Sequence, residues 1–431
     1  MRAPLLTRGL LTQSADMLFD EANRYLLSLG HETLTIKLGL ENTETLLEAL
    51  GNPHKNFPSV QIAGTNGKGS TAAFLDSICR AAGIRTGLFI SPHLISITER
   101  IRVAGESIIE EEFARFTSIV RSTAETLVSE GKLDTLPTFF EHVTAIALLA
   151  FREARVELAI LETGLGGRLD STTAARAKVV AITPIAMDHE EYLGHTIEEI
   201  ATEKAAIIRP GVAAIIAPQE PAALNVIRRR CETVGVEPRL VDPASIEGAT
   251  IGLRGRHQQI NAAIAIALAE ALGERGFNIA NDAVIAGLEE ATHPGRLELW
   301  PGSPPILFDG AHNPASAQAL RNYLDEFVSQ PITMIFGAMR DKRLTEIGAT
   351  LFPKADRLIL TGIDNPRAAS FEDLESAAPR EFDRSKIYAA ASPRDALGIA
   401  HDLTTNEGMI LITGSLYLVG AAQKILQPQT A

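Results

Sequence analysis

The chain has 431 residues, of which 45% are hydrophobic, and a formal net charge of −13 at pH 7. This length predicts two or three domains, and the negative charge argues against sequence-independent binding to nucleic acid. No run approaches the ~20 apolar residues of a membrane helix, and the first residues lack the apolar core of a signal peptide. The two cysteines, Cys79 and Cys231, are isolated in the sequence. They favour a reducing, cytoplasmic compartment over a disulfide framework.

Short apolar runs alternate with longer amphipathic stretches in the first two thirds of the chain. The runs predict buried parallel strands at residues 59–63, 86–90, 157–162, 178–183 and 212–217. The stretches between them predict helices that include residues 70–82, 109–130, 138–154 and 197–208. This alternation is typical of a doubly wound α/β sheet.

A second α/β series begins near residue 300. Strands are predicted at residues 306–309, 332–336, 357–360 and 409–413, with helices at 314–328, 344–351 and 392–403. Residues 293–305 hold four prolines and two glycines, which indicate a boundary between domains at 1–294 and 295–431. A cleft between two such domains is a favoured place for a ligand.

A glycine-rich loop follows the first predicted strand and precedes a helix. It consists of Gly64, Thr65, Asn66, Gly67, Lys68, Gly69 and Ser70. Glycines let backbone amides wrap phosphate oxygens, while the helix N-terminus and the lysine favour negative charge. The spacing departs from the strict Walker pattern, and Gly69 stands where a magnesium-binding hydroxyl should be. The loop therefore predicts a phosphate site whose metal ligands come from elsewhere.

Three side chains that could bind a metal follow predicted strands. Ser91 follows the second strand, Glu162 ends the third, and His189 comes shortly after the fourth. Side chains at the ends of parallel strands gather at one edge of a sheet, so a hydroxyl, a carboxylate and an imidazole could share one divalent ion. Lys204 lies on a predicted helix, and its spacing alone indicates a solvated surface lysine.

Taken together, the motifs resemble the folylpolyglutamate synthase and dihydrofolate synthase family of the Mur ligase superfamily. The resemblance covers about residues 38–420. It rests on GTNGKGS at 64–70, SPHL at 91–94, ERIRV at 99–103, TFFE at 138–141, LETGLGGRLD at 161–170, DH at 188–189, EKAAI at 203–207, PGR at 294–296, FDGAHNP at 308–314 and TGSLYLVG at 413–420.

The resemblance implies a P-loop-type, doubly wound ATPase domain followed by a smaller Rossmann-like domain. It also implies roles for individual residues. Ser91, Glu162 and His189 match magnesium ligands, and Lys204 matches a lysine that is often carbamylated and supports a second Mg²⁺. Lys68, Glu162, His189 and Lys204 form the implied catalytic set. ATP contacts are implied for residues 64–70, Asn261, Arg296, Asp309 and His312.

The implied pterin-contacting residues are Thr138, Phe139, Phe140, Glu141, Leu169, Asp170 and Ser171. Lys37 belongs to another stretch that lines the pterin site in relatives and varies among them. By resemblance, the enzyme joins L-glutamate to a folate, and also to dihydropteroate, through an acyl phosphate formed from ATP. The preference between the two acceptors stays open. Magnesium, a further monovalent cation and a monomeric state are part of the same expectation.

Two other functions fit parts of the pattern. A Mur-type peptidoglycan ligase would use the same chemistry, but it usually carries an N-terminal domain for a UDP-sugar, and the loop at Gly64 is expected to leave too little room for one. A regulatory NTPase without ligase activity would not need the second domain with Asp309, His312 and Asn313.

Overall fold

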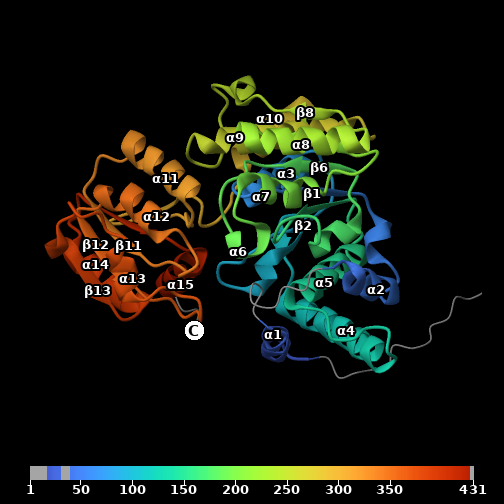
Figure 1. Cartoon of the computed structure of the whole chain (residues 1–431), viewed down its shortest axis with the longest axis horizontal. Coiled ribbons are helices and arrows are strands. Elements are labelled where there is room, and N and C mark those ends of the chain that lie inside the picture. Colours follow the sequence, from blue (N-terminus) through green and yellow to red (C-terminus); the bar gives the residue numbers. More distant parts are fainter. Residues whose placement is uncertain (1–16, 31–38, 428–431) are drawn as a thin grey trace, which may run out of the picture.

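The computed structural model describes residues 17–30 and 39–427. Figure 1 shows two lobes, with the chain from blue to yellow in one lobe and the orange and red part in the other. Each lobe is built around its own sheet, as the two series of predicted strands indicate. Within the described residues, no helix has the length and apolar character needed to cross a bilayer.

The first sheet has eight strands in the order β4-β3-β2-β5-β1-β6-β7-β8. Its central strands are parallel, while β3 and β4 add an antiparallel hairpin at one edge. The strands are β1 Ser59–Ala63, β2 Thr86–Phe89, β3 Ile101–Val103, β4 Glu106–Ser107, β5 Leu158–Glu162, β6 Val179–Ile182, β7 Ala213–Ile216 and β8 Pro238–Leu240. Every residue of β1 and β5 is buried, because helices cover both faces of a doubly wound sheet.

Side chains alternate between the two faces of this sheet, so each face has its own helices. One face packs against α3 Lys68–Ala81, α9 His257–Gly273 and α10 Asn281–Glu290. The other face packs against α1 Phe19–Ser28, α2 Glu41–Ala49, α4 Glu110–Ser129 and α5 Phe139–Glu153, and farther along against α6 Glu190–Leu193, α7 Ile197–Ala205 and α8 Pro221–Val234.

The second sheet has six strands in the order β13-β12-β11-β14-β10-β9. They are β9 Glu298–Trp300, β10 Ile306–Phe308, β11 Ile332–Phe336, β12 Arg357–Thr361, β13 Ile387–Ala390 and β14 Met409–Thr413. On one face lie α11 Pro314–Phe327, α12 Leu344–Leu351 and α13 Phe371–Ser376, and on the other lie α14 Pro393–Leu403 and α15 Leu416–Leu426. The fold is thus the predicted pair of α/β units.

Two strands of the second sheet have no counterpart in the prediction. β9 lies in the proline-rich stretch that reads as a linker, and it pairs antiparallel with β10. β13 is an edge strand whose residues are mostly half-buried, so it lacks the apolar run that marks a central strand. The second sheet therefore starts at Glu298, inside the predicted boundary region.

The two domains interlock where the loop after β2 meets α15. The side chain of Leu94 packs into the hydrophobic cluster that α14 and α15 form with the second sheet. Gly420, on α15, lies so close that an added Cβ would overlap the backbone carbonyl of Leu94. Because Ser91 belongs to the same loop, the position of the C-terminal domain is tied to that part of the cleft.

Gly420→Ala is expected to destabilise the protein, although alanine favours a helix. The added methyl must displace backbone, and overpacking of this kind costs about 1–3 kcal/mol. Gly398→Ala on α14 is the matched control, because a Cβ there meets nothing within 4 Å and should stabilise the helix by about 1 kcal/mol. The melting temperature should fall in Gly420→Ala and rise in Gly398→Ala, both relative to the wild type. A Gly420 variant as stable as the Gly398 variant would contradict the predicted clash.

Candidate active site

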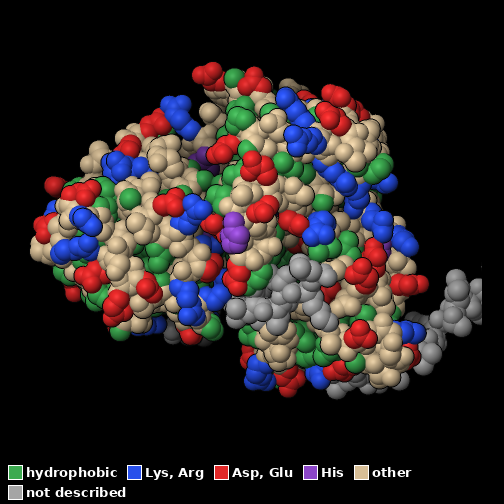
Figure 2. All heavy atoms as spheres, in the orientation of Figure 1, with side chains coloured by type: hydrophobic (Ala, Val, Ile, Leu, Met, Phe, Trp, Pro, Cys, Tyr) green, Lys and Arg blue, Asp and Glu red, His purple; other side chains and the backbone are tan. Residues whose placement is uncertain are grey.

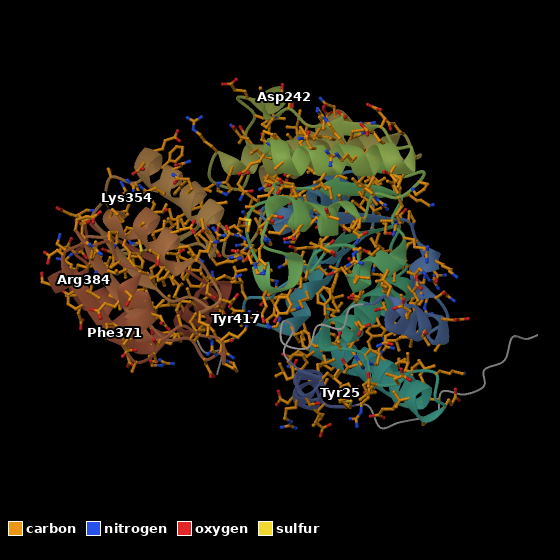
Figure 3. The ribbon with its side chains drawn as sticks, viewed as in Figure 1. Tyr25, Asp242, Lys354, Phe371, Arg384 and Tyr417 are labelled. Carbon is orange, nitrogen blue, oxygen red and sulfur yellow. The ribbon has the colours of Figure 1, made fainter. Side chains whose placement is uncertain are left out.

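A cavity of about 670 Å³ lies between the two domains and draws its walls from both. The space-filling view shows the surface hollowed along the boundary of the two lobes, with acidic and basic side chains interspersed around it (Figure 2). The first domain contributes the glycine-rich loop, the ends of β2 and β5, the start of α5, and α6. The second contributes Arg296, the start of α11 and the loops after β10, β11, β12 and β14. Figure 3 places Tyr417 on the side of the second domain that faces the first.

The glycine-rich loop has the shape that a phosphate cradle needs. Gly64 and Gly67 have φ values of 147° and 88°, and an added Cβ would overlap Thr183 at the first position and Asn261 at the second. The amides of Thr65 and Asn66 donate to Pro184 O at 3.1 and 3.2 Å, which holds the loop against the end of β6. Because α3 begins at Lys68, the first amides of that helix have no intrahelical partner and line the cavity.

Ser91 and Glu162 meet beside this loop because β2 and β5 are neighbours in the sheet. The Ser91 amide donates to Glu162 Oε2 at 3.1 Å. Burial raises the pKa of the Glu162 carboxyl, and the nearby positive charge of Lys68 opposes that rise. A buried carboxylate that lines a cavity and accepts one bond from a neutral amide is well placed to bind a cation.

His189 lines the same cavity as Ser91 and Glu162. It has a left-handed backbone with φ 52°, and its amide donates to Asp188 Oδ1 at 2.9 Å. Burial lowers the pKa of its imidazole to about 3, so the ring is neutral and can act as a ligand. In the described part of the chain, no three His, Cys, Asp or Glu side chains form a ready metal cluster. The three-residue metal site therefore stays a prediction.

Lys204 is buried in the last turn of α7, so the surface position that its spacing indicates is wrong. Its Nζ donates to Gly64 O at 2.9 Å, directly behind the glycine-rich loop. Burial, together with the nearby charge of Lys68, lowers its pKa to about 7. A large fraction of the amine is therefore neutral near pH 7, which is the form that carbamylation requires.

The depressed pKa of Lys204 predicts that stability rises with pH between about 7 and 10.5. In that window the unfolded state binds the lysine proton and the folded state does not, so raising the pH favours folding. The gain is complete above pH 10.5 and absent below 7. Urea midpoints measured across this range should have a smaller pH slope in Lys204→Met, whereas the exposed-lysine variant Lys178→Met should keep the wild-type slope. Equal slopes in all three proteins would refute the burial effect.

Four residues were predicted to contact ATP from outside the loop, and all of them line the cavity. The Asn261 amide donates to Gln258 Oε1 at 2.8 Å, which orients it against Gly67. Asp309 accepts the amides of Leu297 at 3.0 Å and Ala311 at 2.9 Å, while burial raises its pKa and Arg296 opposes that rise. The His312 Nδ1 lies 2.7 Å from Gly310 O.

The predicted pterin wall lines the cavity except at Phe139. Thr138 caps α5, with its amide donating to Glu141 Oε2 at 2.7 Å, and the Phe140 ring packs at a tilt of 44° against Phe89. The Phe139 side chain turns instead into the core beneath α5, under the guanidinium of Arg100, and does not line the cavity. One step along a helix rotates a side chain by about 100°, so Phe139 can face the core while Phe140 faces the cavity.

The loop that contains the other predicted pterin residues is held by its own acid. Asp170 accepts the amides of Gly164 and Leu165, both at 2.9 Å, and its burial raises its pKa. Ser171 Oγ lies 2.6 Å from Thr144 Oγ1, and Leu169 lines the cavity. Lys37 lies outside the described residues.

A network of polar residues joins the two domains, and it combines motif residues with Lys342, which the motifs did not include. The Asp188 carboxylate accepts hydrogen bonds from two side chains of the second domain. Lys342 Nζ donates to Oδ1 at 2.6 Å, and Asn313 Nδ2 donates to Oδ2 at 3.1 Å. The Asn313 amide also donates to Asn66 Oδ1 of the glycine-rich loop at 3.0 Å. Lys342 follows β11, so the rule that chemistry gathers after parallel strands could have found it in the second sheet as well.

Fold and cavity together define a two-domain Mur ligase. The Mur ligase middle domain matches residues 62–237, and the Mur ligase glutamate ligase domain matches residues 295–416. The dihydrofolate synthase/folylpolyglutamate synthase of Bacillus subtilis is 35% identical over 425 residues, covering 92% of this chain and 97% of that protein. The protein of the same name from Mycobacterium tuberculosis is 34% identical and covers 90% and 89%. The chain belongs to the dihydrofolate synthase/folylpolyglutamate synthase family.

Solved structures of the family agree along nearly the whole chain. The Mycobacterium tuberculosis folylpolyglutamate synthase complexed with ADP has a TM-score of 0.87 at 31% identity, covering 94% of this chain and 98% of its own. Escherichia coli FolC in complex with DHPP and ADP has a TM-score of 0.85 at 29% identity, covering 97% and 100%. A bifunctional enzyme with Mn, AMPPNP and L-glutamate bound has a TM-score of 0.81 at 28% identity, covering 94% and 98%.

Proposed function

We propose that the protein is an ATP-dependent ligase that joins L-glutamate to the carboxylate of a folate, and also of dihydropteroate, with release of ADP and phosphate. The names of the relatives and the ligands in the solved structures support this function. One observation carries it: the glycine-rich loop, the wall of Thr138, Phe140 and Glu141, and the second domain border one cavity, so a nucleotide, an acid and an amine could meet there.

The nucleotide would lie with its phosphates on the glycine-rich loop and its nucleoside between α9 and the second domain. The amides at the start of α3 and the Lys68 ammonium would hold the β- and γ-phosphates. Asn261, Arg296, Asp309 and His312 would complete the site, the last three from residues 295–431, which we propose as the second domain. Positioning and charge stabilisation dominate phosphoryl transfer, so these groups suffice without covalent catalysis.

Ser91, Glu162 and His189 would hold a divalent ion next to the γ-phosphate. The donor set fits, because Glu162 presents a buried carboxylate to the cavity and His189 is neutral. When bound, Mg²⁺ would neutralise charge on the phosphoryl group. Carbamylated Lys204 would add a carboxylate behind the loop for a second ion, and a monovalent cation remains part of the proposal.

The acceptor acid would enter along Thr138, Phe140, Glu141 and residues 169–171. Its carboxylate oxygen attacks the γ-phosphorus, the bond to the β-phosphate oxygen breaks, and ADP leaves with that electron pair. The glutamate nitrogen, as the free amine, then attacks the acyl carbon. The tetrahedral intermediate loses a proton from the nitrogen to water and collapses to the amide, and inorganic phosphate leaves with the electron pair of the C–O bond. Phe139 would act from the core by supporting the start of α5.

An ADP-release assay tests the function. Purified protein with ATP, Mg²⁺ and L-glutamate should release ADP when dihydropteroate or tetrahydrofolate is added, and the two acceptors in parallel give the preference. ADP release with a UDP-sugar peptide instead would identify a peptidoglycan ligase. Release that needs neither acid nor glutamate would identify a regulatory NTPase.

We also infer that the protein works as a monomer in the cytoplasm. Cys79 and Cys231 are both buried and unpaired, as expected for a protein from a reducing compartment. Both substrate walls come from one chain, so no second copy is needed to complete the cavity. Sedimentation at several concentrations checks the monomeric state.

A further inference from the structure

A glutamine occupies the middle of a central strand of the first sheet, away from water. Gln61 lies on β1, between β5 and β6, and it is fully buried. Its neighbours Val60 and Ile62 belong to the hydrophobic cluster that α3, α9 and α10 form with the sheet, so the Gln61 side chain projects from the opposite face. On that face it meets the short 3₁₀ helix η3 Ser171–Ala175, which follows the loop at the end of β5.

The Gln61 amide bonds two neighbouring hydroxyls of η3. Gln61 Nε2 donates to Thr172 Oγ1 at 3.0 Å and to Thr173 Oγ1 at 2.6 Å. Thr173 Oγ1 in turn donates to Gly167 O at 2.7 Å. A carbonyl oxygen can only accept, so the Thr173 proton is committed to Gly167 and the hydroxyl accepts from Gln61. The direction of these bonds fixes the orientation of the Gln61 amide.

Thr172 continues this chain of bonds to Asp170. Thr172 Oγ1 donates to Asp170 Oδ1 at 2.5 Å, and the Thr172 amide donates to the same oxygen at 3.0 Å. The other oxygen, Asp170 Oδ2, accepts the amides of Gly164 and Leu165. Gln61 is therefore one end of a buried chain of hydrogen bonds, and the backbone of the loop after β5 is the other end.

The loop that Gln61 holds is part of the cavity wall. Residues 164–166 and 168–171 line the cavity, whereas Gln61 and the two threonines do not. Gly164 lies so close to Phe140 of the predicted pterin wall that an added Cβ would overlap the phenyl ring. A displacement of the loop would therefore change the shape of that wall. Gln61 can act on a ligand in the cavity only through this loop.

The unsatisfied half of the Gln61 amide argues against a role in stability. Gln61 Oε1 is buried and has no hydrogen-bond partner among the residues that the structure describes. A buried amide that is satisfied on one side only is less favourable than an apolar side chain of the same shape. Methionine would fill the same space without an unpaired oxygen. What glutamine adds is a fixed position for the loop.

We propose that Gln61 is a positioning residue for the acceptor acid: it holds the loop 164–171 in the place where the acid binds, without touching the acid. The inference rests on the proposed ligase function and assigns a residue that acts on one of its substrates. ATP binding should not depend on Gln61, because β5 and β6 hold the β1 backbone from both sides as it leads into the glycine-rich loop.

Gln61→Met is the first test, with the KM of each substrate measured separately. Losing the two bonds to η3 should raise KM for the acceptor by about 10-fold, while KM for ATP stays within about twofold. Calorimetric titration of dihydropteroate or tetrahydrofolate, whichever the wild type prefers, should show the same loss of affinity. The melting temperature should stay at or above that of the wild type. Gln330→Met, an exposed glutamine before β11, is the control and should change none of these values.

Two changes at Thr173 separate the hydrogen bond from the packing. Thr173→Val keeps the shape of the side chain without its hydroxyl, so it should raise KM for the acceptor as Gln61→Met does. Thr173→Ser keeps the hydroxyl and should restore a KM near that of the wild type. Because both residues act through one chain of bonds, the loss in the double variant Gln61→Met/Thr173→Val should be smaller than the product of the two single losses. Fully independent losses would overturn the proposed chain.

An unchanged KM for the acceptor in both Gln61→Met and Thr173→Val would overturn the inference. A lower melting temperature with equal losses for all three substrates would also overturn it, because that pattern belongs to a structural residue. Failure of the proposed function has a different signature, in which the wild type releases no ADP with any acid and glutamate. If Gln61→Met does not fold, as judged by its melting curve, Thr173→Val and Thr173→Ser decide the question.

Discussion

Glu162→Gln should lower the turnover of ATP by about 10²- to 10³-fold without lowering the stability of the fold. The carboxylate lies beside the glycine-rich loop and within 3.1 Å of the Ser91 amide, where a metal would reach the γ-phosphate. Glutamine keeps the shape of the side chain but removes its charge, so a cation would bind weakly. The loss of one such electrostatic contribution typically lowers turnover by this factor. ADP release at saturating Mg²⁺ measures the loss.

The pKa of Glu162 gives the sign of the stability effect. Burial raises it above 4.5, so its stabilising contribution exists below that pH and is lost as the pH rises through the folded-state pKa. At pH 7.5 the buried charge is therefore a cost, and Glu162→Gln should melt at the same or a higher temperature. Glu157→Gln, an exposed position just before the same strand, should leave both properties unchanged. Full ADP release by Glu162→Gln would show the metal assignment to be wrong.

Lys68→Met should reduce turnover by a similar factor, about 10²- to 10³-fold, through the loss of one charge at the phosphates. Lys68 begins α3 and its Nζ lies 3.3 Å from Thr65 O, so the side chain lies along the loop that it would help to charge. Stopped-flow binding measurements should show a lower affinity for ATP and a smaller change in the affinity for the folate acceptor.

The same variant has an independent signature at Lys204. The charge of Lys68 is one cause of the low pKa of Lys204, so removing it should raise that pKa above about 7. The pH at which Lys204 becomes available for carbamylation should rise with it, which ¹³C-bicarbonate NMR can follow. Lys55→Met, an exposed change before β1, should alter neither turnover nor this pH. A Lys68 variant with normal turnover would contradict the placement of the phosphates.

The central strands of both sheets are predictable because burial on two faces demands apolar, β-rich runs. β1 and β14 are buried at every residue and coincide with predicted strands. β13 and β9 are edge strands with half-buried side chains, so their sequences carry a weaker signal. The pairing of a short edge strand depends on a neighbour that comes later or earlier in the chain, which local pattern cannot supply.

The glycine-rich loop is equally a property of local sequence. Gly64 and Gly67 adopt backbone angles that other residues rarely reach, and the helix that follows begins within the motif. The sequence also places Ser91 and Glu162 at strand ends, and the parallel pairing of β2 with β5 in the structure brings the two together. Strand ends do not predict that His189 caps α6 with a left-handed backbone, since that depends on the path of the loop after β6.

By itself, the sequence determined two α/β units, a phosphate-type loop between a strand and a helix, and the family to which the chain is similar. Local backbone preference and the periodicity of buried residues are enough for that. The tertiary structure decided that Lys204 is buried behind the loop, that Phe139 belongs to the core, and that Gln61 holds the loop after β5 through two threonines. Solvation and pairing depend on neighbours from distant parts of the chain, and packing alone brings those neighbours together.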